Sequence, residues 1–167
     1  MIFVTVGTHE QPFNRLIEYV DNFKKKGTIQ EEVIIQTGFS TYEPKYCTFQ
    51  KLYPYDQMKQ LVNEARIIIT HGGPSSFIMP LQIGKIPIVV PRQFKFNEHV
   101  NNHQVEFCNA VRDRYNNIIV VEDIDKLGNI INNYDNVIKN LQGSLSSHNL
   151  TFCTEFENIA TALVGQK

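Results

Sequence analysis

The stretch THGGPSSF, at residues 70–77, carries the residue types best suited to binding an anion. Gly72 and Gly73 let a backbone approach a ligand closely, while Ser75 and Ser76 offer hydroxyls and can cap a helix. A helix that begins here would direct the positive end of its dipole at the ligand. The pattern favours a diphosphate cradle, although a glycine pair followed by serine also occurs in turns that bind nothing.

A second polar stretch, PRQFKFNEHVNNHQVEF at residues 91–107, follows the apolar run IPIVV. Hydrogen-bonding side chains crowd into a segment that is expected to open a helix. A solvent-facing helix surface would explain some of these residues, but it explains their density less well than a ligand does. The polar residues of this stretch are Arg92, Glu98, His99, Asn101, Asn102, His103 and Gln104.

A third stretch, GTHEQPF at residues 7–13, holds groups that can transfer a proton and follows the apolar run IFVTV. Gly7 permits a tight turn, and the following helix presents free N–H groups that can bind an anionic ligand. Gly7 and Thr8, just before this helix, are therefore candidate contacts with such a ligand. His9 and Glu10 are the candidates for a catalytic base, since either can accept a proton where it faces a cleft. A turn without a ligand, and a base on another polypeptide, remain the alternatives.

Short apolar runs separated by helical patterns position these three stretches. The runs are nearly continuous rather than alternating, so the sequence predicts a parallel sheet of about six strands with helices on both faces. We interpret residues 1–167 as a single Rossmann-like α/β domain, in which ligands bind beyond the carboxyl ends of the strands. The predicted buried strands are IFVTV at 2–6, VIIQT at 33–37, CTFQKL at 47–52, RIIIT at 66–70, IPIVV at 86–90 and NIIVV at 117–121.

Two helical regions stand out between and after these runs. Pro12 is expected in the first turn of a helix with one apolar stripe. From Asp123 onward, LGNIINNYDNVIKNL and FENIATAL predict two or three closing helices separated by the polar turn GSLSSHN. The stripe after Pro12 consists of Phe13, Leu16, Ile17, Val20 and Phe23.

Composition argues against several classes of function. The 16 Lys and Arg residues against 17 Asp and Glu, with a pI near 6.5, leave no basic footprint for nucleic acid or an anionic membrane. Cys47, Cys108 and Cys153 lack CxxC spacing, which argues against a zinc site or a disulfide framework and favours the reducing cytosol. No apolar stretch approaches the ~18 residues of a membrane span. We therefore expect membrane contact to be peripheral or through a partner.

Dinucleotide and metal chemistry are also disfavoured. The fingerprint GxGxxG is absent, and the second predicted strand runs into Thr37 and Gly38 instead of an acidic residue that would hold an adenosine ribose. This counts against a dehydrogenase. Asp123 and Asp125 form a DxD pair, a motif that can bind manganese, but Asp123 follows a strand directly and is expected to cap a helix. We expect no metal and no cofactor.

The elements HGGPSS and EHVNNHQ, each after a predicted strand, together with the opening MIFVTVGTHEQPF, resemble the glycosyltransferase family 28 C-terminal domain, to which MurG belongs. The resemblance covers about residues 1–122 and is closest to the short PssE- and EpsF-type subunits of capsule and exopolysaccharide synthesis. It implies half of a GT-B fold and an inverting, metal-independent transfer of a hexose from a UDP-sugar. Galactose is the first expectation for that sugar, with glucose and N-acetylglucosamine open.

The resemblance also implies roles for individual residues. The loop after the fourth strand would hold the UDP diphosphate, and the loop after the fifth strand would contact the donor sugar. Uracil would lie against LYPYDQM at residues 52–58, where Tyr53 and Tyr55 are candidates unless they merely pack. The implied diphosphate contacts are Gly72, Gly73, Ser75 and Ser76, and the implied sugar contacts are Glu98, His99, Asn102, His103 and Gln104.

One position departs from the family pattern. Relatives often carry a glutamate that grips the uridine ribose, and this chain has Met79 at that uridine-binding position, followed by Pro80. Proline lacks an N–H, so the helix after Ser76 is expected to begin late or to kink. A decayed site would favour the alternative of a non-catalytic or regulatory subunit that binds a sugar nucleotide.

A GT-B active site lies between two Rossmann-like domains, and this chain supplies one. The resemblance therefore implies a heteromeric complex with a membrane-anchored, acceptor-binding subunit at the cytoplasmic face of the cell membrane. The implied acceptor is a sugar on a polyprenyl diphosphate. Candidate contacts with the partner, which core packing would explain equally, are Phe152, Phe156, Ile159 and Leu163.

Overall fold

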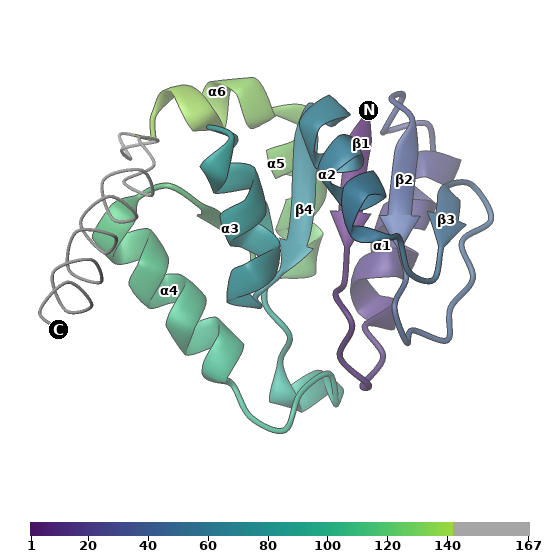
Figure 1. Cartoon of the computed structure of the whole chain (residues 1–167), viewed down its shortest axis with the longest axis horizontal. Coiled ribbons are helices and arrows are strands. Elements are labelled where there is room, and N and C mark those ends of the chain that lie inside the picture. Colours follow the sequence, from purple (N-terminus) through teal and green to yellow (C-terminus); the bar gives the residue numbers. More distant parts are fainter. Residues whose placement is uncertain (142–167) are drawn as a thin grey trace, which may run out of the picture.

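A computed structural model describes residues 1–141, which form a six-stranded parallel sheet with strand order β3-β2-β1-β4-β5-β6 (Figure 1). The predicted fold class is confirmed. Strand order reverses between β1 and β4, which is where open parallel sheets bind their ligands. The strands are β1 (Ile2–Thr5), β2 (Val33–Gln36), β3 (Thr48–Gln50), β4 (Ile67–His71), β5 (Ile88–Val90) and β6 (Ile119–Val120).

Helices cover both faces of the sheet because the strands bury side chains on both sides. Ile2 and Val4 of β1 pack in one apolar cluster with α1, α5 and α6, whereas Phe3 faces a second cluster with α2. A third cluster joins α3 and α4 to β5. The helices are α1 (Asn14–Lys25), α2 (Tyr55–Glu64), α3 (Pro74–Gln82), α4 (His103–Tyr115), α5 (Leu127–Asn132) and α6 (Tyr134–Lys139), with short 3-10 turns η1 (Phe94–Phe96) and η2 (Ile124–Lys126).

Helix α1 has the predicted apolar stripe but a later start. Phe13 is its N-terminal flanking residue, so Pro12 lies outside the helix and not in its first turn. The stripe is buried from Phe13 to Val20, and Phe23 is half-buried. Helices α5 and α6 confirm two of the predicted closing helices. The segment FENIATAL, Cys153 and the four candidate partner contacts Phe152, Phe156, Ile159 and Leu163 lie outside the described residues.

The third strand is not buried, contrary to expectation. Thr48, Phe49 and Gln50 are all exposed, because β3 forms the edge of the sheet and pairs with β2 alone. The loop before it is instead fixed by Asp21 of α1, which is 0% exposed. The Asp21 carboxylate accepts hydrogen bonds from the N–H groups of residues 45–47 and from the Tyr42 hydroxyl at 2.8 Å. The sequence pattern around Asp21 did not distinguish this buried aspartate from one that faces solvent.

Helix α3 does not begin late, which was one of the two alternatives expected for it. It starts at Pro74 and runs through Pro80, so a late start with Pro80 in the first turn is wrong. Pro74 is tolerated at the first helical position because the N–H that it lacks would have no partner there. Ser75 and Ser76 do not cap the helix: Gly73 is the flanking residue, without a side-chain cap.

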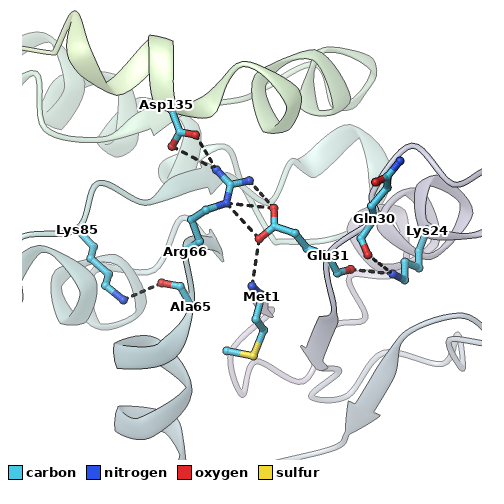
Figure 2. Close-up of polar contacts among 8 residues, drawn as sticks. All are labelled: Met1, Lys24, Gln30, Glu31, Ala65, Arg66, Lys85 and Asp135. Atoms are coloured by element: carbon cyan, nitrogen blue, oxygen red, sulfur yellow. Dashed lines mark hydrogen bonds and ion pairs between the residues drawn. The ribbon is translucent and has the colours of Figure 1, made fainter.

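A charged cluster lies at the amino ends of β1, β2 and β4 (Figure 2). Arg66 bridges Glu31 and Asp135, and the amino group of Met1 donates to Glu31 at 3.0 Å. The Arg66 hydrogen bond lowers the pKa of the Glu31 carboxyl. Among residues 1–141, no helix combines the length and hydropathy required to cross a membrane.

Candidate nucleotide-sugar site

A cavity of about 570 Å³ opens at the carboxyl ends of β1, β2 and β4. Its floor is formed by Thr5, Gln36 and His71, which end these three strands. The cavity thus lies at the point where strand order reverses, as predicted for a parallel sheet. Many of the residues singled out by sequence line it together: Gly7, Thr8, His9, Tyr53, Tyr55, Ser75, Ser76 and Met79.

The loop after β5 lies beside this cavity and does not line it. The His99 ring of this loop lies against the cavity-lining His9, with 5.1 Å between the two ring centroids. Asn102 accepts a hydrogen bond from the Phe94 N–H at 3.0 Å and so shapes the loop itself. The predicted residues outside the lining are Glu10, Gly72, Gly73, Glu98, His99, Asn102, His103 and Gln104.

His71 is a site residue that sequence reasoning missed. Its Nδ1 accepts a hydrogen bond from the Gly73 N–H at 3.0 Å, and its Nε2 lies 2.8 Å from the Ser76 hydroxyl oxygen. Burial, together with the positive charge of Arg92, lowers the pKa of His71 to about 4. The ring is therefore neutral at pH 7. A histidine that directly precedes a glycine pair at a strand end was the available signal.

The glycines of the site serve to make room for His71. A Cβ on Gly7, whose φ is +74°, or on Gly73 would overlap the imidazole ring. Their N–H groups are already used, because Gly7 donates to the Thr5 hydroxyl at 3.2 Å and Gly73 donates to His71. Gly72 likewise donates to the Gln104 side chain at 3.1 Å. Contacts of Gly7, Gly72 and Gly73 with a diphosphate stay predictions, and each would have to be made alongside these existing bonds.

Two buried side chains after β5 hold the loops around the cavity together. Arg92 is 1% exposed, and its guanidinium donates to the carbonyls of Gln11 at 2.7 Å and Glu98 at 3.2 Å. The Gln104 amide oxygen accepts from the N–H groups of Gly72 and Arg92, both at 3.1 Å. Buried backbone groups need such partners. The need to pair buried backbone groups therefore explains why some of the polar side chains in residues 91–107 are present.

Glu98 takes part in the same framework. It is 3% exposed, accepts two hydrogen bonds from Arg15 at 2.8 and 2.9 Å, and accepts one from the Gln93 N–H at 3.0 Å. A bidentate contact between an arginine and a carboxylate fixes the relative orientation of the two side chains as well as stabilising their charges. Contacts of Glu98 and Gln104 with a donor sugar stay predictions, and each would have to be made alongside these existing bonds.

Of the two candidate bases, His9 has the better position. It lines the cavity, and its Nδ1 accepts from the Gln11 N–H at 3.2 Å. In a neutral ring this contact places the proton on Nε2, so His9 can accept a further proton only at Nδ1, in exchange for the Gln11 contact. Burial lowers the pKa of His9, with a further contribution from Arg92, and so favours the neutral ring that can accept a proton. Glu10 is exposed and outside the lining.

The DxD pair has the capping role that was predicted for it. The Asp123 carboxylate accepts from the Asp125 N–H at 3.2 Å at the start of η2. Within residues 1–141, no three His, Cys, Asp or Glu side chains are grouped so as to hold a metal ion.

Residues 1–158 match the glycosyltransferase family 28 C-terminal domain. The chain belongs to this family. It is 33% identical over 116 residues to the human UDP-N-acetylglucosamine transferase subunit ALG13. That match covers 64% of the chain but 10% of the human protein, so the chain spans a small part of this relative.

A solved structure supports the fold of this family 28 domain. The glycosyltransferase of kitacinnamycin superposes with a TM-score of 0.54 at 14% identity. The superposition covers 86% of this chain and 35% of the other. The chain therefore has the Rossmann-like architecture of one half of a GT-B glycosyltransferase.

Proposed function

We propose that this chain is the catalytic, donor-binding subunit of an inverting glycosyltransferase that moves a hexose from a UDP-sugar to a polyprenyl-diphosphate-linked sugar. The observation that carries the proposal is a single cavity, lined by Ser75 and Ser76 at the start of α3 and by Tyr53 and His9. Its volume lies within the ~300–1,000 Å³ typical of small-molecule sites.

The nucleotide spans the cavity from the α2 side to the start of α3. Tyr53 and Tyr55 contact uracil, and the hydroxyls of Ser75 and Ser76 bind the diphosphate at the positive end of the helix. Met79 offers a thioether where many relatives hold ribose with a carboxylate, so the ribose depends on other groups here. The donor sugar extends towards the loop after β5, where Asn102 and His103 begin α4.

Transfer proceeds by displacement at the anomeric carbon. An acceptor hydroxyl attacks from the face opposite the diphosphate, and the bond between the sugar and UDP breaks. The hydroxyl proton passes to Nδ1 of neutral His9, which releases the Gln11 N–H to accept it. Negative charge then grows on the departing diphosphate, and the hydroxyls and helix end stabilise it. Attack opposite the leaving group inverts the anomeric configuration.

The acceptor requires a second polypeptide. This chain supplies one of the two Rossmann-like halves between which a GT-B cleft forms, and it resembles a protein named as a subunit. Its net charge of −1 provides no overall attraction to an anionic membrane surface. A membrane-anchored, acceptor-binding partner supplies both the second half of the cleft and the location at the inner face of the membrane.

Binding by calorimetry tests the donor half of the proposal. The chain should bind UDP more tightly than NAD or ATP, and comparable affinities for all three would exclude the nucleotide assignment. UDP-galactose, UDP-glucose and UDP-N-acetylglucosamine should then be compared. Galactose follows from the resemblance to capsule galactosyltransferase subunits, and the name of the human relative favours N-acetylglucosamine as the second candidate.

Transfer assays test the catalytic half. The purified chain should bind UDP-sugar but transfer little until membranes that contain the partner are added. Robust polyprenyl-linked transfer by the isolated chain would contradict the need for a partner. Binding without transfer, even with partner membranes, would favour the non-catalytic sugar-nucleotide-binding subunit instead.

A further inference from the structure

The start of α3 has few backbone donors left for an anion. The N–H of Ser76 donates to the carbonyl of Gly73 at 3.0 Å, and Pro74 has no N–H. The N–H groups of both loop glycines donate to side chains, as described above. Within residues 72–76, this leaves Ser75 as the residue whose N–H lacks a partner among the described residues. Side-chain hydroxyls must therefore supply much of the hydrogen bonding at this helix end.

The protonation of His71 decides what the Ser76 hydroxyl can do. Because Nδ1 accepts the Gly73 N–H, it carries no proton, and a neutral ring then has its proton on Nε2. The Nε2–H consequently donates to the Ser76 oxygen at 2.8 Å. In that contact the Ser76 oxygen acts as an acceptor, so the proton of the Ser76 hydroxyl remains free to be donated to another group. Ser76 lines the cavity.

The ring has little freedom to leave this position. His71 ends β4, is 9% exposed, and lies between Gly7 and Gly73, whose missing side chains provide its space. Rotation of the ring by 180° would bring a carbon to Gly73 and lose both hydrogen bonds. The surrounding backbone thus selects one orientation and one tautomer.

We propose that His71 is a positioning residue that orients the Ser76 hydroxyl as a proton donor to the diphosphate of the bound nucleotide. The inference rests on the proposed UDP-sugar function and deepens it. In this proposal the glycines beside His71 leave space for its ring and do not contact the phosphates directly. The resulting relay runs from His71 to the Ser76 hydroxyl and from that hydroxyl to the diphosphate. Negative charge grows on the diphosphate as UDP departs. A preoriented hydrogen-bond donor therefore stabilises that stage more than it stabilises the substrate complex.

Two replacements of His71 separate its two hydrogen bonds. In His71→Asn, the amide oxygen can still accept the Gly73 N–H but nothing reaches Ser76. In His71→Gln, the longer amide can still donate to Ser76. We expect His71→Asn and Ser76→Ala each to weaken UDP binding on the order of tenfold, and the double variant to weaken it no further. His71→Gln should retain most of the affinity.

Uridine, which lacks phosphates, separates orientation of the hydroxyl from general damage. Its binding should change by less than about twofold in all these variants, and Gln82→Ala, on the exposed end of the same helix, should leave both ligands unaffected. Additive losses in the double variant, or equal losses for uridine and UDP, would overturn the proposal. A wild-type chain that binds neither ligand would overturn the proposed function and this inference with it.

The tautomer can be measured without any ligand. Long-range ¹H–¹⁵N correlation spectra at pH 7 should show the His71 ring neutral, with its proton on Nε2. A proton on Nδ1 would contradict the proposed relay directly, whatever the binding data show. Ser76→Ala should leave this tautomer in place, because the Gly73 contact selects it.

Discussion

The guanidinium of Arg92 donates to the carbonyl oxygen of Val6 at 2.9 Å and so joins two loops that lie 86 residues apart in the sequence. Val6 follows β1, and Arg92 follows β5. The same side chain stacks on the Phe13 ring with 4.8 Å between the guanidinium carbon and the ring centroid. A buried arginine therefore sets how the His9 loop sits over the cavity.

Replacing Arg92 by Met should lower the free energy of unfolding by about 3 kcal/mol, because several buried carbonyls lose their donor at once. Urea unfolding measures this change. Arg112→Met removes an exposed arginine that pairs with its neighbour Asp113 and should change stability by less than about 0.5 kcal/mol. Equal effects of the two substitutions would mean that the Arg92 contacts contribute no more than a surface pair.

Gly73→Ala should weaken UDP binding more than uridine binding, because the added Cβ displaces the His71 ring. Gly27→Ala is the control for backbone strain. Gly27 has a φ of +70° and nothing near its missing Cβ, whereas Gly73 has a φ of −77° and would suffer the overlap with His71 without that strain. That control should lose about 1 kcal/mol of stability and keep its ligand affinity. Calorimetry with both ligands distinguishes displacement of the ring from backbone strain.

His103→Ala and Gln104→Ala should behave differently although they are neighbours. His103 is exposed at the start of α4, so its loss should impair use of the sugar donor more than binding of UDP alone. Gln104 supports the backbone of Gly72 and Arg92, so its loss should reduce stability and weaken both ligands together. If Gln104→Ala affected the UDP-sugar alone, its amide would belong to the sugar site and not to the framework.

Stability should fall in mild acid because of His71. Its pKa is lowered from 6.5 to about 4 in the folded chain, so between these values the unfolded chain binds the proton more readily. The contribution is complete above about pH 6.5 and is lost as the pH falls to about 4, by about 3 kcal/mol in all. Urea unfolding of His71→Asn should show a correspondingly flatter pH dependence across this window. Gln82→Ala, which removes no ionisable group, should keep the wild-type curve.

Transfer should persist in excess EDTA when partner membranes are present, because helix-end and hydroxyl groups are proposed to stabilise the departing diphosphate. Asp125→Ala should keep full activity. Asp123→Ala should lower stability by about 1 kcal/mol, since it removes the cap of η2, without a change in affinity for UDP. Activity that EDTA abolishes and manganese restores would return the DxD pair to consideration as a metal site.

The sequence by itself determined the sheet and the location of the site. Continuous apolar runs such as RIIIT report burial on both faces, and the polar stretches after them must then gather at one edge of a parallel sheet. That reasoning predicts a shared site for Thr8 and Ser76, to which the family resemblance adds Tyr53, and all three line one cavity. The sequence also predicted that Asp123 caps a helix, and it caps the short 3-10 helix η2, because capping depends on neighbours two or three residues away.

The tertiary structure alone decided which polar residues line the cavity and which hold the backbone. Gly72 and Gln104 are 32 residues apart, and Arg92 and Val6 are 86, so no local pattern distinguishes their hydrogen bonds from ligand contacts. The exposure of β3 likewise depends on its place at the sheet edge. Burial and hydrogen-bond pairing depend on the complete tertiary structure. Buried polar groups must hydrogen-bond with one another, and the fold decides which of them meet.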